Sequence, residues 1–188
     1  MLRRSLLAVP LAAPAFAQAE WRPGRPITFI VPFAAGSGTD AVARVLAQML
    51  GTELGGATIT VDNIAMARVA RAEPDGHTLF VTTNTTHAAN PWLMRRLDYD
   101  PVADFSPISR LGNFVFWLTV GPSAPVSTLA EFLALARTRQ VSYASGNGTG
   151  IVAGATVARM GGVQMLHVPY RSTPPAITDV LAGRVDSI

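Results

Sequence analysis

Two short loops of this sequence share the pattern Gly-x-Gly-Thr, at residues 36–39 and 146–149. Each follows an apolar run and precedes a segment with helical periodicity. Glycine allows positive φ values and leaves successive N–H groups accessible, and the start of a helix adds unpaired N–H donors and a partial positive charge. Neighbouring Ser and Thr hydroxyls add further donors. The pair predicts a site for a small anion, in particular a carboxylate, that needs neither lysine nor arginine.

Two alternatives remain open for these loops. Residues 36–41 match the dinucleotide fingerprint G-x-G-x-x-G/A, and Asp62 at the end of the next apolar run lies near the place of a ribose-binding acid. Against a dinucleotide, residues 32–35 separate the strand from the first glycine, and the charge of Asp40 would repel a pyrophosphate. Both loops also fit ordinary strand-to-helix turns in which Ser or Thr caps the helix. The repetition of the pattern in matching contexts favours anion binding.

Composition excludes several other classes of function. The chain has 188 residues, no Cys and, among its 15 basic residues, no Lys. Phosphate-loop lysines, Schiff-base lysines, disulfides and thiolate metal sites are therefore excluded. The net charge is +3 and the Arg residues are scattered, so we expect no nucleic-acid partner. The three His residues lack metal-ligand spacing and no G-x-S-x-G motif occurs, so we expect no metal ion, no cofactor and no enzymatic activity.

The N-terminus has the features of an export signal. Residues 1–4 are basic, residues 6–16 are apolar, and Ala-Phe-Ala at 15–17 is typical of a signal-peptidase site. We expect residues 1–17 to be removed and the mature chain, from residue 18, to reach the periplasm. No apolar stretch is long enough to cross a bilayer as a helix, so we do not expect the protein to span the membrane.

Alternating strand and helix patterns must position the two loops. The sequence predicts strands at 27–31, 57–61, 78–82, 114–120, 141–144 and 165–168, and helices at 42–50, 64–72, 149–160 and 174–182, with a few helical residues in 87–96. The first helix has apolar Val42, Val45, Leu46, Met49 and Leu50. A Thr128-x-x-Glu131 capping box begins another helix. This alternation predicts an α/β fold with parallel sheets, in which ligands bind at the carboxyl ends of the strands.

The chain is expected to form two lobes. The polar stretch at 98–106 is the predicted crossing, so we assign residues 18–104 to lobe 1 and residues 105–188 to lobe 2. The last residues, from 184 onward, have the pattern of a strand that is only beginning. One Gly-x-Gly-Thr loop then belongs to each lobe, and a ligand held between them would contact both.

Five segments carry a resemblance to a known family. PITFIVPFAAGSGTDAVARVLAQML, PDGHTLFVTTNTTHAANP, LDYDPVADFSPIS, VSYASGNGTG and HVPYRSTPPAITDVLAGRVD occur in that order. They resemble the extracytoplasmic solute-binding proteins of tripartite tricarboxylate transporters, the Bug family, over nearly the whole mature chain. The resemblance implies a two-lobed Venus-flytrap protein that captures a small carboxylate and delivers it to membrane permease subunits. We expect it to act as a monomer.

The resemblance also implies which residues face the ligand. They lie in a first loop, a strand-end loop, the loop of the second lobe and the cleft rim: Phe33, Gly36, Ser37, Gly38, Thr39 and Asp40; Thr83, Thr85 and His87; Ser145, Gly146, Asn147, Gly148 and Thr149; and Tyr170. Asp40 is unusual in an anion site. Its carboxylate would either cap backbone N–H groups or bind the ammonium group of an amino-acid ligand.

The sequence departs from the family pattern in two places. Family members usually carry a glycine-rich insertion after the second strand, whereas Asn63 here runs directly into Ile64. Members also continue well beyond the position of Ile188, so we expect the second lobe to be incomplete. Two other functions therefore stay open: a secreted α/β enzyme acting on a small anionic substrate, and a truncated, nonfunctional remnant.

Overall fold

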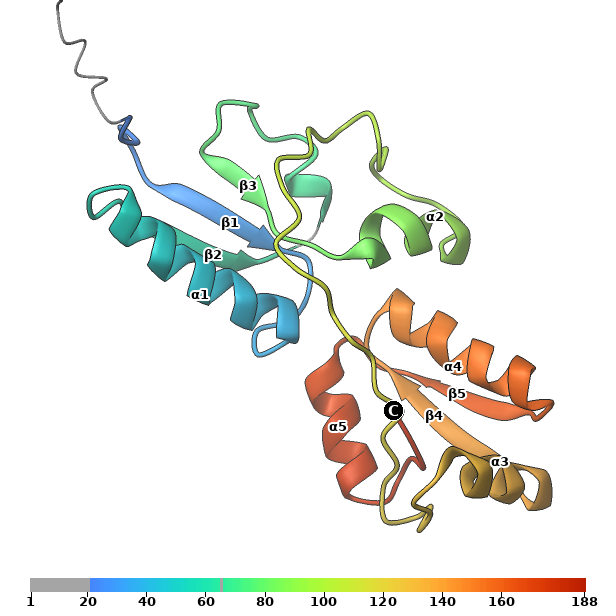
Figure 1. Cartoon of the computed structure of the whole chain (residues 1–188). Coiled ribbons are helices and arrows are strands. Elements are labelled where there is room, and N and C mark those ends of the chain that lie inside the picture. Colours follow the sequence, from blue (N-terminus) through green and yellow to red (C-terminus); the bar gives the residue numbers. More distant parts are fainter. Residues whose placement is uncertain (1–20, 65) are drawn as a thin grey trace, which may run out of the picture.

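Lobe 1 is built on a three-stranded parallel sheet. The computed structural model describes residues 21–64 and 66–188 (Figure 1). The lobe contains β1 (Ile27–Val31), α1 (Gly38–Glu53), β2 (Ile59–Asn63), β3 (Thr78–Phe80) and α2 (Asn90–Leu93), with a π-helical turn at Thr85–Ala89. The strand order is β2-β1-β3, so the apolar strand β1 is central. The export signal predicted at residues 1–17 lies outside the described residues.

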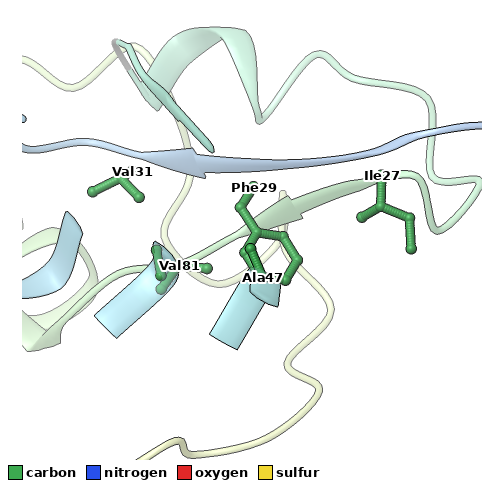
Figure 2. Close-up of a cluster of buried hydrophobic side chains, with 6 residues drawn as sticks. Ile27, Phe29, Val31, Ala47 and Val81 are labelled. Carbon is green, nitrogen blue, oxygen red and sulfur yellow. The ribbon is translucent and has the colours of Figure 1, made fainter. Parts of the chain in front are cut away.

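The core of lobe 1 lies between the sheet and α1. Phe29 and Val31 of β1, Ala47 of α1 and Val81 after β3 converge there (Figure 2). The predicted buried face of α1 is confirmed only in part: Leu46 and Leu50 pack on the core, but Val45 and Met49 are exposed, and Ala43 and Ala47 lie deepest against the sheet. Small side chains allow the closest approach of a helix to a sheet, and here they decide which face packs.

Lobe 2 has a parallel pair of strands with helices on both faces. Its elements are α3 (Leu129–Thr138), β4 (Val141–Ser145), α4 (Gly148–Gly161), β5 (Met165–Pro169) and α5 (Thr173–Leu181). Phe132 of α3 packs on Val141, and Val180 of α5 packs on Ala144, which faces the other way on β4. The Thr128–Glu131 capping box is present. The strands and helices predicted between residues 141 and 182 are confirmed to within one or two residues.

The last residues of the chain extend the sheet of lobe 2. Ser187 bridges Tyr143 of β4 on one side and Val120 on the other. Asp186 accepts hydrogen bonds from Arg139 at 2.7 Å and from the Ser142 N–H at 2.8 Å. Burial acts to raise the pKa of Asp186, but these bonds outweigh it and hold the pKa at about 2. The prediction of a strand beginning here agrees with this pairing.

Two predicted elements are wrong. No strand forms over 114–120, where only Val120 makes a bridge and Trp117 is 81% exposed. A strand needs a neighbour that pairs with its backbone, and only residues 119–121 have one, at residues 186–188. The helix predicted at 64–72 is reduced to a short 3-10 turn at Met66–Arg68. Its turns close mainly by bonds between residues three apart, as from Val69 N–H to Met66 O.

The two lobes present the same ends of their sheets to each other. The carboxyl ends of β1 and β3 point toward lobe 2, and that of β4 points toward lobe 1 (Figure 1). Helices α1, α4 and α5 begin on this side, as the sequence predicts for parallel sheets. None of the helices in residues 21–64 and 66–188 is both long and apolar enough to span a bilayer.

Substitution of Gly154 tests how α4 is seated on the sheet. A Cβ at this position would overlap the ring of Tyr143, which is buried on β4. We expect Gly154→Ala to lower the free energy of unfolding by about 1–3 kcal/mol, measured by urea denaturation, because overpacking outweighs the helix propensity of alanine. Gly112→Ala is the control, since no atom lies within 4 Å of the position that its Cβ would take and no loss of stability is expected. A stabilised Gly154→Ala protein would contradict this packing.

Candidate functional site

The first Gly-x-Gly-Thr loop forms the start of α1. Ser37 is the N-cap, and its hydroxyl accepts a hydrogen bond from the Asp40 N–H at 3.3 Å. Gly36 has a φ of +80°, which favours glycine, and its N–H donates to the Asp40 carboxylate at 2.9 Å. Ser37 and Thr39 are buried, whereas Gly38 is exposed and lies near the Phe114 ring. The loop is thus a capped helix start in which some N–H groups already donate to Ser37 and Asp40.

The Asp40 carboxylate is bonded within lobe 1. The residue is 3% exposed and accepts from Arg44 Nε and from Asn63 Nδ2, each at 3.0 Å. The bond from Arg44, with those from Gly36 and Asn63, outweighs burial and lowers the pKa of Asp40 to about 2. Of the two roles that the sequence left open, this geometry is that of a cap on backbone N–H groups. The same carboxylate occupies the position in which a dinucleotide phosphate would need free donors.

The second Gly-x-Gly-Thr loop joins β4 to α4. Asn147 is the N-cap of α4, and its side-chain oxygen accepts from the Gly150 N–H at 2.9 Å. Gly146 lies against the backbone of Ser172 and Thr173, where any side chain would overlap. Unlike Gly36, neither glycine of this loop has a positive φ. Close approach of the chain, and not backbone conformation, therefore requires glycine at residue 146.

Two residues near the second loop were not predicted from the sequence. Ser172 is buried and is the N-cap of α5, yet its side chain makes no capping bond. A Ser shortly before Pro174 at a helix start was the available signal. His167 on β5 lies within 2.6 Å of the Ser145 hydroxyl through Nε2 and stacks on Tyr143. Only the register that places Tyr143 opposite His167 brings this pair together.

A direct contact joins the two lobes at residues predicted to face the ligand. The hydroxyls of Thr85 and Thr149 lie 2.8 Å apart, and the Thr149 N–H donates to Thr85 Oγ1 at 3.3 Å. The Thr149 hydroxyl also lies 3.0 Å from Asn84 Oδ1. A Cβ on Gly148 would come within 3.0 Å of Leu93 and 3.1 Å of Thr85. The first turn of α4 therefore rests on the π-helical turn of lobe 1.

Three other predicted residues are bonded to or packed against other residues of the chain. The Thr83 hydroxyl accepts from the Thr85 N–H at 3.3 Å. His87 packs against Phe105 with ring centroids 5.0 Å apart, and burial lowers the pKa of its imidazole. The Tyr170 hydroxyl donates to Asp179 at 2.7 Å. These side chains hold the surrounding turns, and the geometry brings neither His87 nor Tyr170 to the Thr85–Thr149 contact.

A cavity of about 270 Å³ adjoins this contact on the side of lobe 1. Phe33, Met66, Thr85, Arg96 and Tyr99 are among the residues that line it. Phe33 also packs on the core of lobe 1, and its carbonyl accepts from Asn63. A larger open hollow of about 720 Å³ lies along β2 and α1, away from both Gly-x-Gly-Thr loops. The smaller cavity is the one that two predicted site residues border.

A family comparison agrees with this architecture. The model of a family described as "Tripartite tricarboxylate transporter family receptor" matches residues 42–188, which is most of the chain. The chain belongs to this family. The matched range includes the second Gly-x-Gly-Thr loop and begins two residues after Asp40, so the first loop lies outside it. The resemblance noted in the sequence is confirmed.

Similar proteins give a consistent picture of this family. A UPF0065 protein of Bordetella bronchiseptica is 33% identical over 197 residues, covering 98% of this chain and 58% of its own. Among solved structures, a periplasmic transporter matches with a TM-score of 0.83 and 34% identity, covering 88% of this chain and 59% of its own. The chain therefore spans about three-fifths of the length of the relatives that it matches.

Two further solved relatives contain carboxylates. The protein Rpa4515 of R. palustris with adipate has a TM-score of 0.80 and 32% identity, covering 88% of this chain and 58% of its own. MatC of Rhodopseudomonas palustris with bound malate has a TM-score of 0.77 and 33% identity, covering 88% of this chain and 60% of its own. The fold is thus that of the two-lobed periplasmic binding proteins, which carry solutes to transporters, and the chain contains only part of it.

The role of Asp40 is tested by its effect on stability. We expect Asp40→Asn to lower the free energy of unfolding at pH 7 by about 1–2 kcal/mol, because charge-assisted bonds are lost. The folded-state pKa of about 2 lies below the ordinary value of 3.8 for an Asp carboxyl, so the carboxylate stabilises the fold above that ordinary value. The difference between the two proteins should shrink as the pH falls from about 4 to 2.

Urea denaturation at a series of pH values measures this difference. The control is Asp98→Asn, because Asp98 is an exposed residue paired with Arg96 at 3.8 Å. Its effect should stay within about 0.5 kcal/mol. An Asp40→Asn effect that does not change with pH would contradict the proposed cap.

Proposed function

We propose that this chain is a solute-binding receptor of a tripartite tricarboxylate transporter and that it captures a small carboxylate between its lobes. The contact between Thr85 of lobe 1 and Thr149 of lobe 2, 2.8 Å apart, is the observation that carries the proposal. It supports a ligand position where the first turn of α4 meets the strand-end turn of lobe 1. The first turn of α4 and the strand-end turn of lobe 1 both follow the carboxyl ends of parallel strands, where α/β folds bind their ligands.

Recognition would rest on neutral donors. The N–H groups in the first turns of α1 and α4 and the hydroxyls of Ser37, Thr39 and Thr149 are the proposed ligand contacts. Helix starts carry a partial positive charge, and closure of the lobes removes water, which strengthens each hydrogen bond to a carboxylate. Because Asp40 already fills part of the first loop, the second loop would contribute the larger share of the attraction.

The ligand class follows from the relatives. Adipate and malate, present in two solved relatives, are dicarboxylates, and we propose a ligand of this kind. Export to the periplasm through residues 1–17 and delivery to membrane permease subunits are part of the same proposal. Binding would occur without chemistry, because Ser145 is 3% exposed and no carboxylate is bonded to His167 in the part of the chain that the structure describes.

Calorimetric titration tests this function and separates it from the alternatives. The mature chain, from residue 18, is titrated with adipate, malate and a monocarboxylate such as acetate. Saturable binding of a dicarboxylate without product formation supports a receptor. Turnover of the added compound supports a secreted enzyme. A lack of binding together with a circular-dichroism spectrum that lacks fixed tertiary structure supports a nonfunctional remnant.

The contact between the lobes gives a sharper test. We expect Thr149→Ala to weaken dicarboxylate binding by about 1 kcal/mol or more, roughly fivefold in Kd, because a hydroxyl donor is lost at the proposed site. Thr138→Ala is the matched control, since this exposed hydroxyl donates to Leu135 O within α3. Equal affinities for the two variants would remove Thr149 from the site.

A further inference from the structure

The pairing of Ser145 with His167 has no counterpart in the function described so far. Resting on the proposed function, we propose that His167 is a positioning residue for the loop at 145–149 and that it couples carboxylate capture to the uptake of a proton. Ser145 ends β4 immediately before this loop, and His167 reaches it from the neighbouring strand β5. The imidazole would therefore act on the ligand through the loop without touching it.

The hydrogen bond between the two side chains depends on protonation. His167 Nε2 and the Ser145 hydroxyl oxygen are 2.6 Å apart, so a single hydrogen lies between them. When Nε2 is unprotonated, the hydroxyl must donate to it. When the imidazole is protonated, the ring donates and the hydroxyl hydrogen becomes free for another acceptor. The protonation state of His167 thus sets whether Ser145 can act as a donor at the loop.

The pair also lies beside the first turn of α4. A Cβ on Gly150 would lie 3.2 Å from the Cβ of Ser145, which places Ser145 against that turn. The partial positive charge at a helix start disfavours a nearby imidazolium. A carboxylate bound there offsets this charge. A carboxylate bound at the loop therefore favours protonation of His167, and protonation of His167 favours carboxylate binding. By thermodynamic linkage these two effects are equal in free energy.

The acidic groups on the elements packed against β5 are already bonded to other residues. In the described part of the chain these elements include β4 and α4, and also α3 and α5 through Met165 and Val168. Glu131 of α3 accepts from the Ser127 and Thr128 N–H groups, and Asp179 of α5 accepts from the Tyr170 hydroxyl and from Arg184. On β4 the titratable group is Tyr143, whose ring stacks on His167 at 5.0 Å and whose pKa is raised by burial, so it stays neutral. On α4 the charged residue is Arg159, exposed in the last turn. A bound carboxylate would add a negative charge that is not bonded to another residue of the chain.

Titration of adipate at pH 6 and pH 8 tests the coupling. The proteins are the wild type, His167→Gln and the control His77→Gln. Glutamine retains a polar group toward Ser145 but takes up no proton. His77 lies at the opposite end of the lobe 1 sheet, where it contacts the Pro26 carbonyl at 3.3 Å. The ionisation of adipate itself changes between pH 6 and pH 8, and this change affects all three proteins equally. Only ratios of their affinities at each pH are therefore compared.

We expect the affinity of the wild type relative to His167→Gln to rise about 3- to 10-fold from pH 8 to pH 6, since histidine side chains titrate in this range. His77→Gln should follow the wild type. Calorimetry in buffers of different ionisation enthalpy should detect more proton uptake on binding by the wild type than by His167→Gln. Adipate binding with a constant affinity ratio and equal proton uptake by the two proteins would overturn the coupling and leave the proposed function standing.

Absence of adipate and malate binding by the wild type at either pH would instead overturn the proposed function, and the coupling with it. Should His167→Gln fail to fold, NMR of the wild-type imidazole resonances gives the same answer. The midpoint of the His167 titration should move to higher pH when adipate is bound, while that of His77 stays in place. An unchanged His167 midpoint with adipate bound would overturn the coupling.

Discussion

The need to satisfy N–H groups at helix starts governs the arrangement of this molecule. At α1 the donors are met from within lobe 1, by Ser37 and by the buried carboxylate of Asp40. At α4 they are met partly by Asn147 and partly from the other lobe, by Thr85. The two loops thus share a sequence pattern but differ in electrostatics, because one already contains an internal anion and the other does not.

The same constraint explains how the lobes are joined. A helix start that is satisfied across an interface holds the two lobes together only as long as the contact lasts, and neutral hydroxyl bonds of this kind contribute about 1 kcal/mol each. Such a contact is weak enough to exchange for a ligand. The close approach of Gly148 to Leu93 and of Gly146 to the start of α5 keeps the loop in place on both sides. Glycine at these positions serves packing as much as recognition.

Most elements could be predicted from periodicity because their partners are local. The apolar run of β1 and the capping box of α3 depend on residues that are close together in the sequence. The errors occur where a partner distant in sequence decides. Residues 114–119 have the composition of a strand, but a strand exists only if a neighbour pairs with it. The buried face of α1 was predicted only in part: Leu46 and Leu50 pack on the core, but small alanines, and not the larger valines, lie closest to the sheet.

The sequence by itself determined the α/β class, the two helix-start loops, the family and most of the candidate residues, since these depend on local pattern and composition. Only the tertiary structure decided that Asn63 meets Asp40, that Thr85 meets Thr149, and that Ser145 meets His167. Hydrogen bonds between residues far apart in the chain depend on strand register and lobe placement. Those arise from packing of the whole chain, and no local pattern encodes them.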